Sequence, residues 1–155
     1  GMAVFRGTAT TEAKFSGCDL NNTKWARAKL SHTSFSACKL SGADMTDISS
    51  MGLSFKDTIL RNAFLCGISF LKEKLEGVDL TEADLEGCDF RYAVFDEQCS
   101  LVNARITGAR FESADLRGAD MAGIRMSDPR QFKNAAVSPS QAAQLIRGLG
   151  LRVSL

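Results

Sequence analysis

The stretch Val78–Phe95, VDLTEADLEGCDFRYAVF, has a period of five residues. Large apolar residues recur at Leu80, Leu85, Phe90 and Phe95, and a small or short residue stands two places before each of them. This spacing fits neither the 3.6-residue period of an α-helix nor the two-residue period of a strand. It indicates an internal repeat whose units stack on one another and bury a shared core.

The repeat extends over most of the chain. Large central positions fall at every fifth residue from 5 to 95, one extra residue is inserted within Asp96–Gln98, and the register resumes at Leu101 and ends at Met126. Of these twenty-five central positions, only Thr10 and Ser50 are not large and apolar, and two places earlier nineteen of the twenty-five residues are Ala, Thr or Cys. The central residue of each unit and the residue two places before it thus have nearly fixed sizes. This predicts that both side chains point into a packed interior.

The central residues also sort by type when every fourth unit is compared. If four units form one coil, residues twenty apart stack, and like side chains pack on like along the axis. A period of five alone does not require phenylalanine and leucine to fall into separate columns, whereas stacking in a four-sided coil favours it. The four columns are Phe15, Phe35, Phe55, Leu75, Phe95, Leu116; Leu20, Leu40, Leu60, Leu80, Leu101, Met121; Phe5, Trp25, Met45, Leu65, Leu85, Ile106, Met126; and Thr10, Leu30, Ser50, Phe70, Phe90, Phe111.

The units ADLEG (83–87), ADLRG (114–118) and ADMAG (119–123) resemble the A(D/N)LXX units of the pentapeptide-repeat family. The resemblance covers about residues 3–127. It implies an all-β solenoid, a right-handed quadrilateral parallel β-helix with one unit on each face, here of about six coils. We therefore expect this β-helix over residues 2–127, and a connector, a capping helix and a tail over residues 128–155.

Beyond the repeat, Asp128-Pro129 punctuates the chain and Arg130–Val137 is expected to be a connector. Ser138-Pro139 is an N-cap followed by proline at the first helical position, and Gly148 is a candidate stop. Leu151–Val153 is a candidate short strand. The helix carries an apolar stripe of Ala142, Ala143, Leu145, Ile146 and Leu149. This stripe either covers the open end of the solenoid, which would otherwise invite further stacking, or forms a homodimer contact.

Two places break the pattern. Glu73 occupies a small inward position, where an unpaired carboxylate is costly, so Leu71–Lys74 is expected to bulge or to turn Glu73 outward. This segment and the insertion in Asp96–Gln98 are either local distortions or protruding recognition loops.

The sequence offers no constellation of catalytic or ligating residues. The one histidine, His32, is expected to face solvent. Five cysteines without a CxxC pair fit neither a disulfide framework nor a zinc site. Cys18, Cys38 and Cys99 share one column and Cys88 occupies the same slot on another face, so they are expected to be buried thiols, with Cys66 exposed. The aspartates that precede core residues occupy the usual polar slot of the repeat: Asp19, Asp44, Asp79, Asp84, Asp89, Asp115 and Asp120.

Composition excludes several classes. No apolar run of 18 or more residues is present, no secretory signal is evident, and the unpaired cysteines suit a reducing compartment, so a cytoplasmic location is expected. The formal net charge of +1 gives no general attraction to nucleic acid or membrane.

The charge is uneven, however: residues 71–128 carry seven basic and thirteen acidic side chains. The candidate interaction surface in this region comprises Glu73, Glu76, Glu82, Glu86, Asp96 and Glu97. We therefore expect a non-enzymatic scaffold without cofactor or metal, which binds another protein. The alternative implied by the family is a DNA mimic that binds DNA gyrase or a related topoisomerase and protects it from quinolones. The near-neutral net charge disfavours that alternative, because mimicry requires a strongly acidic surface.

Overall fold

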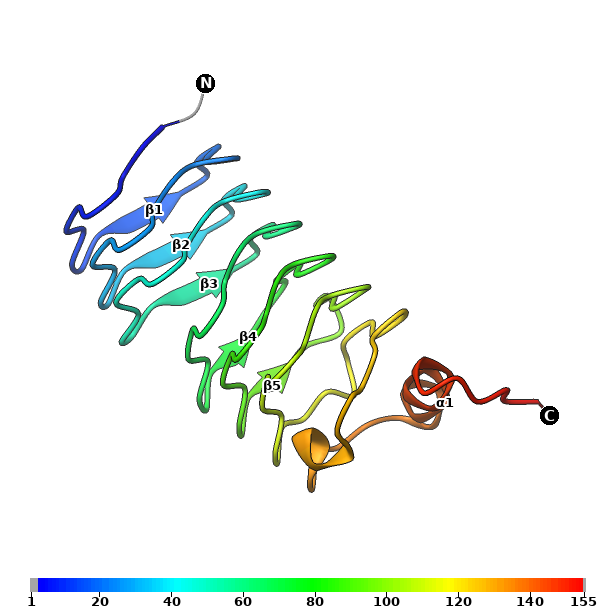
Figure 1. Cartoon of the computed structure of the whole chain (residues 1–155). Helices are drawn as coiled ribbons and strands as arrows, with labels where there is room; N and C mark the ends of the chain where they lie inside the picture. Colours follow the sequence, from blue (N-terminus) through cyan, green and yellow to red (C-terminus); the bar gives the residue numbers. More distant parts are fainter. Residues whose placement is uncertain (1–2, 155) are drawn as a thin grey trace.

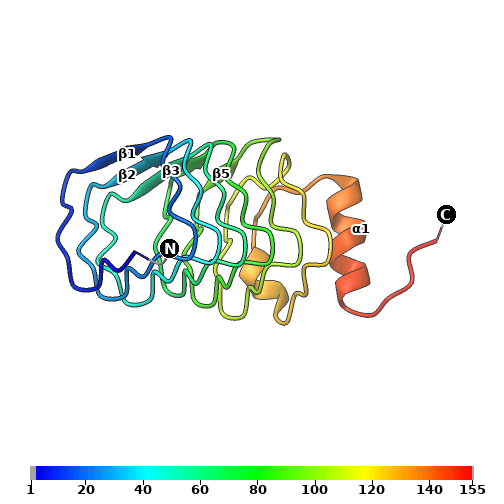
Figure 2. The same cartoon turned by 90° about the horizontal axis from the view of Figure 1, so that it is seen from above.

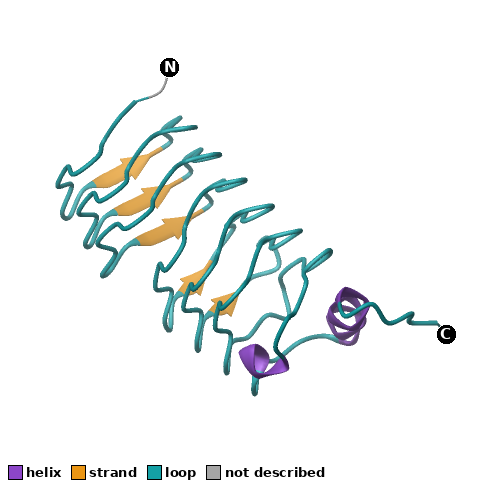
Figure 3. Cartoon of the chain, in the orientation of Figure 1, coloured by secondary structure: helices purple, strands orange, loops and turns teal. Residues whose placement is uncertain are grey.

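The computed structural model describes residues 3–154, which form a rod of stacked coils followed by one α-helix (Figure 1). One face of the rod carries the regular strands, as Figure 3 shows. Strands β1 (Lys14–Ser16), β2 (Ser34–Ser36) and β3 (Ser54–Lys56) pair in parallel, and β4 (Lys74–Leu75) pairs in parallel with β5 (Val94–Phe95). In all three strand pairs the partner residues are twenty apart, which confirms the stacking register inferred from the columns.

The other faces use single parallel bridges instead of strands. Asp19 pairs with Lys39, Lys24 with Asp44 and Lys29 with Ser49, again twenty residues apart. Seen from above, successive coils follow one another along the rod with similar outlines (Figure 2). A short extended piece of two or three residues on each face, followed by a turn, explains why the repeat is five residues long.

The turns depend on left-handed backbone. Residues two places after the central position have positive φ, for example Asn62 (56°), Gly67 (75°), Lys72 (60°) and Gly77 (62°). Glycine and asparagine tolerate this conformation best, although the fold imposes it on Lys72 as well. The same left-handed turn, which forms a corner of the rod, is therefore adopted by glycine, asparagine and lysine alike.

The interior consists of the four predicted columns. Phe35 stacks on Phe15 and Phe55 with ring centroids 4.9 and 5.5 Å apart. On a second face Phe90 stacks on Phe70 at 4.7 Å and on Phe111 at 5.0 Å. Stacked pairs of this kind contribute about 0.5–1.5 kcal/mol each beyond the burial of their area.

The inserted residue makes a compact turn. After Phe95 the pairing offset becomes 21 residues, as in the bridge from Asp79 to Ser100. Asp96 Oδ1 accepts hydrogen bonds from the Gly77 N–H (3.1 Å) and the Gln98 N–H (3.0 Å). The backbone of Gly118 passes so close that a Cβ there would lie 2.6 Å from the Asp96 carbonyl carbon. The insertion is thus a tightly packed local feature.

The expected bulge at Leu71–Lys74 does not form. Lys72 adopts the usual corner conformation, Lys74 pairs with Val94, and Glu73 is half-buried. The irregularity lies in the ladder instead: β3 and β4 belong to separate sheets, with a single bridge between Lys56 and Glu76. We attribute the interruption to Leu53, a large buried residue in the small position one coil before Glu73.

The stack continues past residue 127, where the five-residue register ended. Phe132 stacks on Phe111 with centroids 5.0 Å apart, and Ala136 bridges to Asp115. The segment Arg130–Val137, expected to be a connector, therefore extends the stack by one further layer on two faces of the rod. One further inserted residue before Phe132 hid this continuation from the periodic pattern.

The chain then covers this end of the rod with two similar turns. The 3₁₀-helix η1 (Pro129–Phe132) and helix α1 (Pro139–Gly148) each have a capping box and proline in the first turn, in DPRQ and SPSQ. The side-chain amide of Gln131 donates to the carbonyls of Ile106 (2.8 Å) and Ala109 (2.9 Å). Gln141 donates in the same way to Leu116 and Ala119. The helix predicted from Ser138-Pro139 is confirmed, whereas Leu151–Val153 forms no strand. None of the described helices is long and apolar enough to cross a bilayer.

Candidate interaction surface

The outward aspartates of the repeat stabilise its corners. Asp44 Oδ1 accepts the Thr46 N–H at 3.1 Å, and Asp84 Oδ1 accepts the Glu86 N–H at 3.1 Å. This contact, from aspartate to the N–H two residues later, is an Asx turn. It recurs at Asp19, Asp79, Asp89, Asp96, Asp115, Asp120 and Asp128. These carboxylates therefore have structural partners, as the polar-slot interpretation predicts.

Several of them are also paired with arginine. Arg91 Nη2 lies 2.7 Å from Asp89 Oδ2, and the same Asp-x-Arg arrangement joins Asp115 to Arg117 at 2.7 Å. The hydrogen bond from the guanidinium lowers the pKa of Asp89 and of Asp115 below its ordinary value. These two aspartates of the acidic half of the rod are therefore each paired with an arginine two residues later.

The six acidic residues of the predicted surface do not gather in one patch. Glu76, Asp96 and Glu97 follow β4 and β5, whereas Glu82 and Glu86 lie at the two successive corners along the chain. Glu73 lies before β4 and is half-buried. Glu76 binds Lys56 (3.3 Å) and Lys74 (3.0 Å), and Glu86 binds Arg105 (2.9 Å). Their placement follows from the corners of the repeat.

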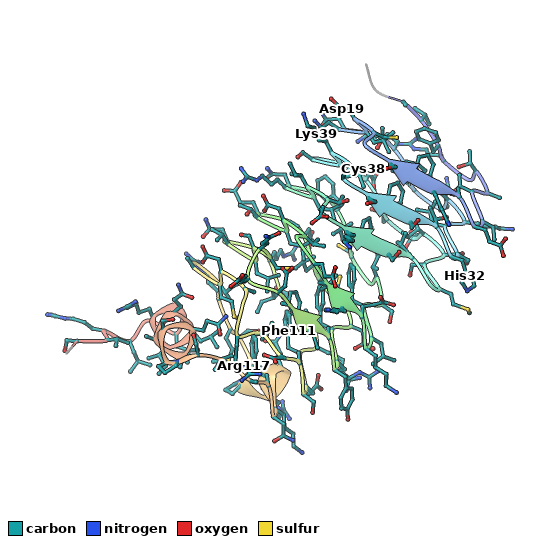
Figure 4. The ribbon with its side chains drawn as sticks, turned by 180° about the vertical axis from the view of Figure 1, so that it is seen from behind. Asp19, His32, Cys38, Lys39, Phe111 and Arg117 are labelled. Atoms are coloured by element: carbon teal, nitrogen blue, oxygen red, sulfur yellow. The ribbon has the colours of Figure 1, made fainter. Side chains whose placement is uncertain are left out.

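The cysteines and the histidine have structural positions. Cys38, Cys88 and Cys99 are buried, and burial raises the pKa of the Cys88 thiol to about 12 and that of Cys99 to about 11. Cys18 is half-buried. His32 is exposed at a corner of the rod, far from the edge where Asp19 and Lys39 lie next to each other (Figure 4).

Cys66 is half-buried, not exposed as expected, because it lies against Asp84 and Glu86. One ligand atom from each of these three residues falls within 4.8 Å of the others. Arg105, however, already bonds both carboxylates, at 3.3 Å from Asp84 and 2.9 Å from Glu86. Asp84 and Glu86 are therefore part of an ion-pair cluster with Arg105, beside which Cys66 lies.

A groove of about 690 Å³ lies between the last coils and α1. Its walls include Asn103, Arg125, Gln144 and Arg147. The groove is open, its lining is mixed polar and apolar, and Gly148 and Ile124, whose backbones approach closely, both line it. It follows from the way α1 crosses the end of the rod.

Large apolar side chains lie exposed in the turns that lead into three consecutive strands. Met51 precedes β3, Leu71 precedes β4, and Tyr92 and Val94 lie at β5. Their exposed fractions range from 39% for Leu71 to 75% for Met51. We call these four residues the Tyr92 edge. Adjacent exposed apolar groups with an aromatic member are characteristic of protein contact surfaces, whereas scattered single ones are ordinary. The five-residue pattern did not reveal this edge, because turn positions carry no fixed residue type.

Residues 3–154 form a solenoid of stacked coils joined by parallel bridges. Sequence profiles of pentapeptide repeats match residues 11–47 (eight copies) and residues 74–115 (nine copies). The chain belongs to the pentapeptide-repeat family. No curated protein sequence matches it significantly.

The chain is similar to several solved structures, of which the first named here shows the same fold. A trypsin-treated form of QnrB1, described as a plasmid-mediated fluoroquinolone resistance protein, has 19% identity and a TM-score of 0.56, with 99% of this chain and 97% of that chain covered. HetL, a pentapeptide-repeat protein involved in heterocyst differentiation regulation in the cyanobacterium Nostoc, has 20% identity and a TM-score of 0.37, covering 84% and 87%. Rfr23 from the cyanobacterium Cyanothece has 19% identity and a TM-score of 0.38, covering 89% and 88%.

Proposed function

We propose that the chain is a non-enzymatic scaffold, a right-handed four-sided rod of about six coils, that binds another protein through the Tyr92 edge. The observation that carries this proposal is the exposure of Met51, Leu71 and Tyr92 on three consecutive coils. Met51 and Leu71 are twenty residues apart and occupy equivalent positions, which the β-ladder spaces by about 4.8 Å, and Tyr92 lies one residue further on in the next coil. Because the rod fixes these positions, little order has to be created on binding.

The charge around the edge suggests the partner's character. Lys72 is exposed in the same turn as Leu71, and Arg91 lies in the turn of Tyr92. Arg91 is bound to Asp89, whereas Lys72 forms no ion pair within the described chain. An apolar contact area with a basic margin favours a partner surface that is apolar and weakly acidic. Glu73, from the acidic set, lies half-buried beneath this edge, and Glu82 and Glu97 are candidate contacts at other corners.

The test compares proteins retained from the native extract by three immobilised forms. The double variant Leu71→Glu with Tyr92→Glu removes the apolar edge, and Phe64→Glu is the matched control because Phe64 is 48% exposed on another face. The proposal expects a protein that wild type and Phe64→Glu retain and the double variant loses. With the purified partner, affinity should fall at least tenfold for the double variant. Equal retention by all three forms refutes the assignment of the edge.

The DNA-mimic alternative receives less support. Its mimicry needs uncompensated negative charge, but the carboxylates of Asp79, Asp89 and Asp115 each pair with an arginine. Inhibition of DNA gyrase supercoiling at micromolar protein would favour that alternative over the scaffold.

A homodimer through α1 is a separate proposal. Ile146 and Leu149 on α1 are 41% and 46% exposed, although Leu145 faces the core. Ile146→Asp should then lower the dimer fraction in sedimentation experiments without affecting the melting temperature, because the side chain is not needed for the fold.

A further inference from the structure

The coil formed by residues 101–120 lacks backbone partners on one of its four faces. On the other three faces the N–H of the central residue donates to a carbonyl of the next layer at 2.7–2.9 Å, from Leu101, Phe111 and Leu116. The fourth central residue is Ile106, whose N–H has no hydrogen-bond partner within residues 3–154. The carbonyl of Ala104 on the same face accepts no hydrogen bond within these residues either, whereas the equivalent carbonyl on each other face accepts one at 2.8–3.1 Å.

The segment that would complete this face contains Arg125. The usual spacing of twenty residues places Arg125 next to Arg105, but these two residues form no bridge. We attribute the displacement to α1, because the backbone of Gly148 lies against the Ile124 carbonyl and the side chain of Ile124 is buried in the core. Helix α1 therefore holds this segment outside the ladder.

A cavity of about 360 Å³ lies at this gap, and its walls include Ala104, Ile106 and Arg125. It shares Asn103, Gly123 and Arg125 with the groove of about 690 Å³ between the last coils and α1, so the two adjoin. Both volumes fall within the range of about 300–1,000 Å³ that is usual for ligand sites. Because the matching groups of the other three faces point toward the next layer, the free Ile106 N–H and Ala104 carbonyl point toward this cavity.

The walls of the cavity and the groove are basic. Arg105, Arg125 and Arg147 line them, and no acidic side chain among the described residues does. Arg105 already binds Asp84 and Glu86, whereas Arg125 and Arg147 are exposed and form no ion pair within residues 3–154. Unpaired guanidinium groups beside free backbone groups favour an anionic ligand that also carries a peptide backbone.

We propose that this gap is a binding site for an extended acidic peptide of a partner protein, which adds to the rod as a parallel strand. One peptide residue donates its N–H to the Ala104 carbonyl, and its own carbonyl accepts the Ile106 N–H. Asp120 makes this pair of bonds on the preceding face, with the Cys99 carbonyl at 3.1 Å and the Leu101 N–H at 2.7 Å. The peptide thus replaces the strand that Arg125 does not form.

The position of this peptide residue selects its side chain. In the rod, a bridged residue such as Asp84 points outward, so an aspartate or glutamate in the gap has Arg105 and Arg125 as neighbours. The peptide residues on either side point inward, where Ile124 already occupies the core, so they must be small. The tail of this chain does not qualify, because Arg152 carries charge of the wrong sign. The site shares no residue with the Tyr92 edge, so the two are tested independently.

The test follows backbone amides by NMR while the peptide Ala-Ala-Asp-Ala-Ala, acetylated and amidated at its ends, is added in millimolar amounts. The Ile106 amide should shift and exchange more slowly with solvent, whereas the amides of Leu101 and Phe111, which already have partners, should change less. Arg125→Ala should weaken binding about two- to fivefold, the effect of an exposed ion pair. Arg27→Ala is the matched control, because Arg27 is exposed in the second coil, and it should leave binding unchanged.

Two further peptides separate the backbone contact from simple charge attraction. Methylation of the aspartate nitrogen removes the donor to Ala104 and should weaken binding at least about fivefold, because a buried carbonyl then stays unpaired. Replacement of the aspartate by lysine should abolish measurable binding. An unshifted Ile106 amide, or equal binding of the methylated or the lysine peptide, overturns the proposal. So does an Ile106 amide that exchanges as slowly as that of Leu101 in the free protein, since Arg125 would then close the ladder itself.

Discussion

Helix α1 covers the C-terminal end of the rod, and the contribution of its hydrogen bonds can be tested at Gln141, which is 4% exposed. Its Oε1 accepts the Ser138 N–H at 2.8 Å, and its Nε2 donates to the carbonyls of Leu116 and Ala119. In Gln141→Ala the Ser138 N–H and the Ala119 carbonyl lose these partners, whereas the Leu116 carbonyl still accepts the Ala119 N–H at 3.0 Å. Each orphaned buried group costs about 1–3 kcal/mol, so for the two groups we expect a loss of about 2–6 kcal/mol in the free energy that holds α1 on the rod.

Gln141→Glu sharpens the test. It keeps the acceptor for Ser138 but directs a second oxygen at two carbonyls, so at neutral pH we expect a larger loss than in the alanine variant. Burial beside carbonyl oxygens raises the folded pKa of the new carboxyl above its unfolded value of about 4.3. The variant is therefore most stable below about pH 4.3, where the carboxyl is protonated in both states, and loses stability as the pH rises through the folded pKa. Gln144→Ala, one turn later in α1, is the control.

The assay is hydrogen exchange read by mass spectrometry over residues 128–148. Exchange should accelerate there in both Gln141 variants and remain at the wild-type rate in Gln144→Ala. The fluorescence of Trp25, which is fully buried near the other end of the rod and stacked on Phe5 at 4.1 Å, should be unchanged. Wild-type exchange rates in Gln141→Ala would refute the argument that these hydrogen bonds secure the cover.

Three further changes test the interior, the insertion and the charges. Leu80→Arg places an unpaired charge at a fully buried site and should abolish the cooperative melt, whereas Glu82→Arg at the neighbouring exposed corner should change the free energy of unfolding by less than about 1 kcal/mol. Gly118→Ala should cost about 1–3 kcal/mol in chemical denaturation, because its Cβ would lie 2.6 Å from the backbone of Asp96. Hydrogen bonding to an arginine lowers the folded pKa of Asp89 below 3.8, so its contribution is present above pH 3.8 and is lost as the pH falls below that value. Melting temperatures measured from pH 6 to pH 2 should decline in this window, and a flat profile would contradict the pairing.

Much of the fold could be predicted from the sequence, because a solenoid repeats one local solution. The pairing of Phe15 with Phe35 and Phe55, and the offset of 21 residues after the insertion, followed from size and spacing. The helix after Ser138 followed from its cap and proline. Phe132 was missed because a second inserted residue moved it out of register, although its type matched the column that ends in Phe111.

The surface could not be predicted in the same way. The acidic residues from Glu73 to Glu97 are close in sequence, but a coil that turns every five residues distributes them over different corners. Leu53, the buried residue in the small position one coil before Glu73, likewise lies twenty residues away in sequence, so a local pattern does not consider it.

The sequence by itself determined which side chains face inward and which residues stack, since burial requires one size at each position of every unit. The tertiary structure alone decided what the outside offers. It brought Met51, Leu71 and Tyr92 onto three consecutive coils and paired the aspartates with arginines. The physical reason is that inward positions share one environment along the whole rod, whereas outward positions acquire neighbours only through the coil.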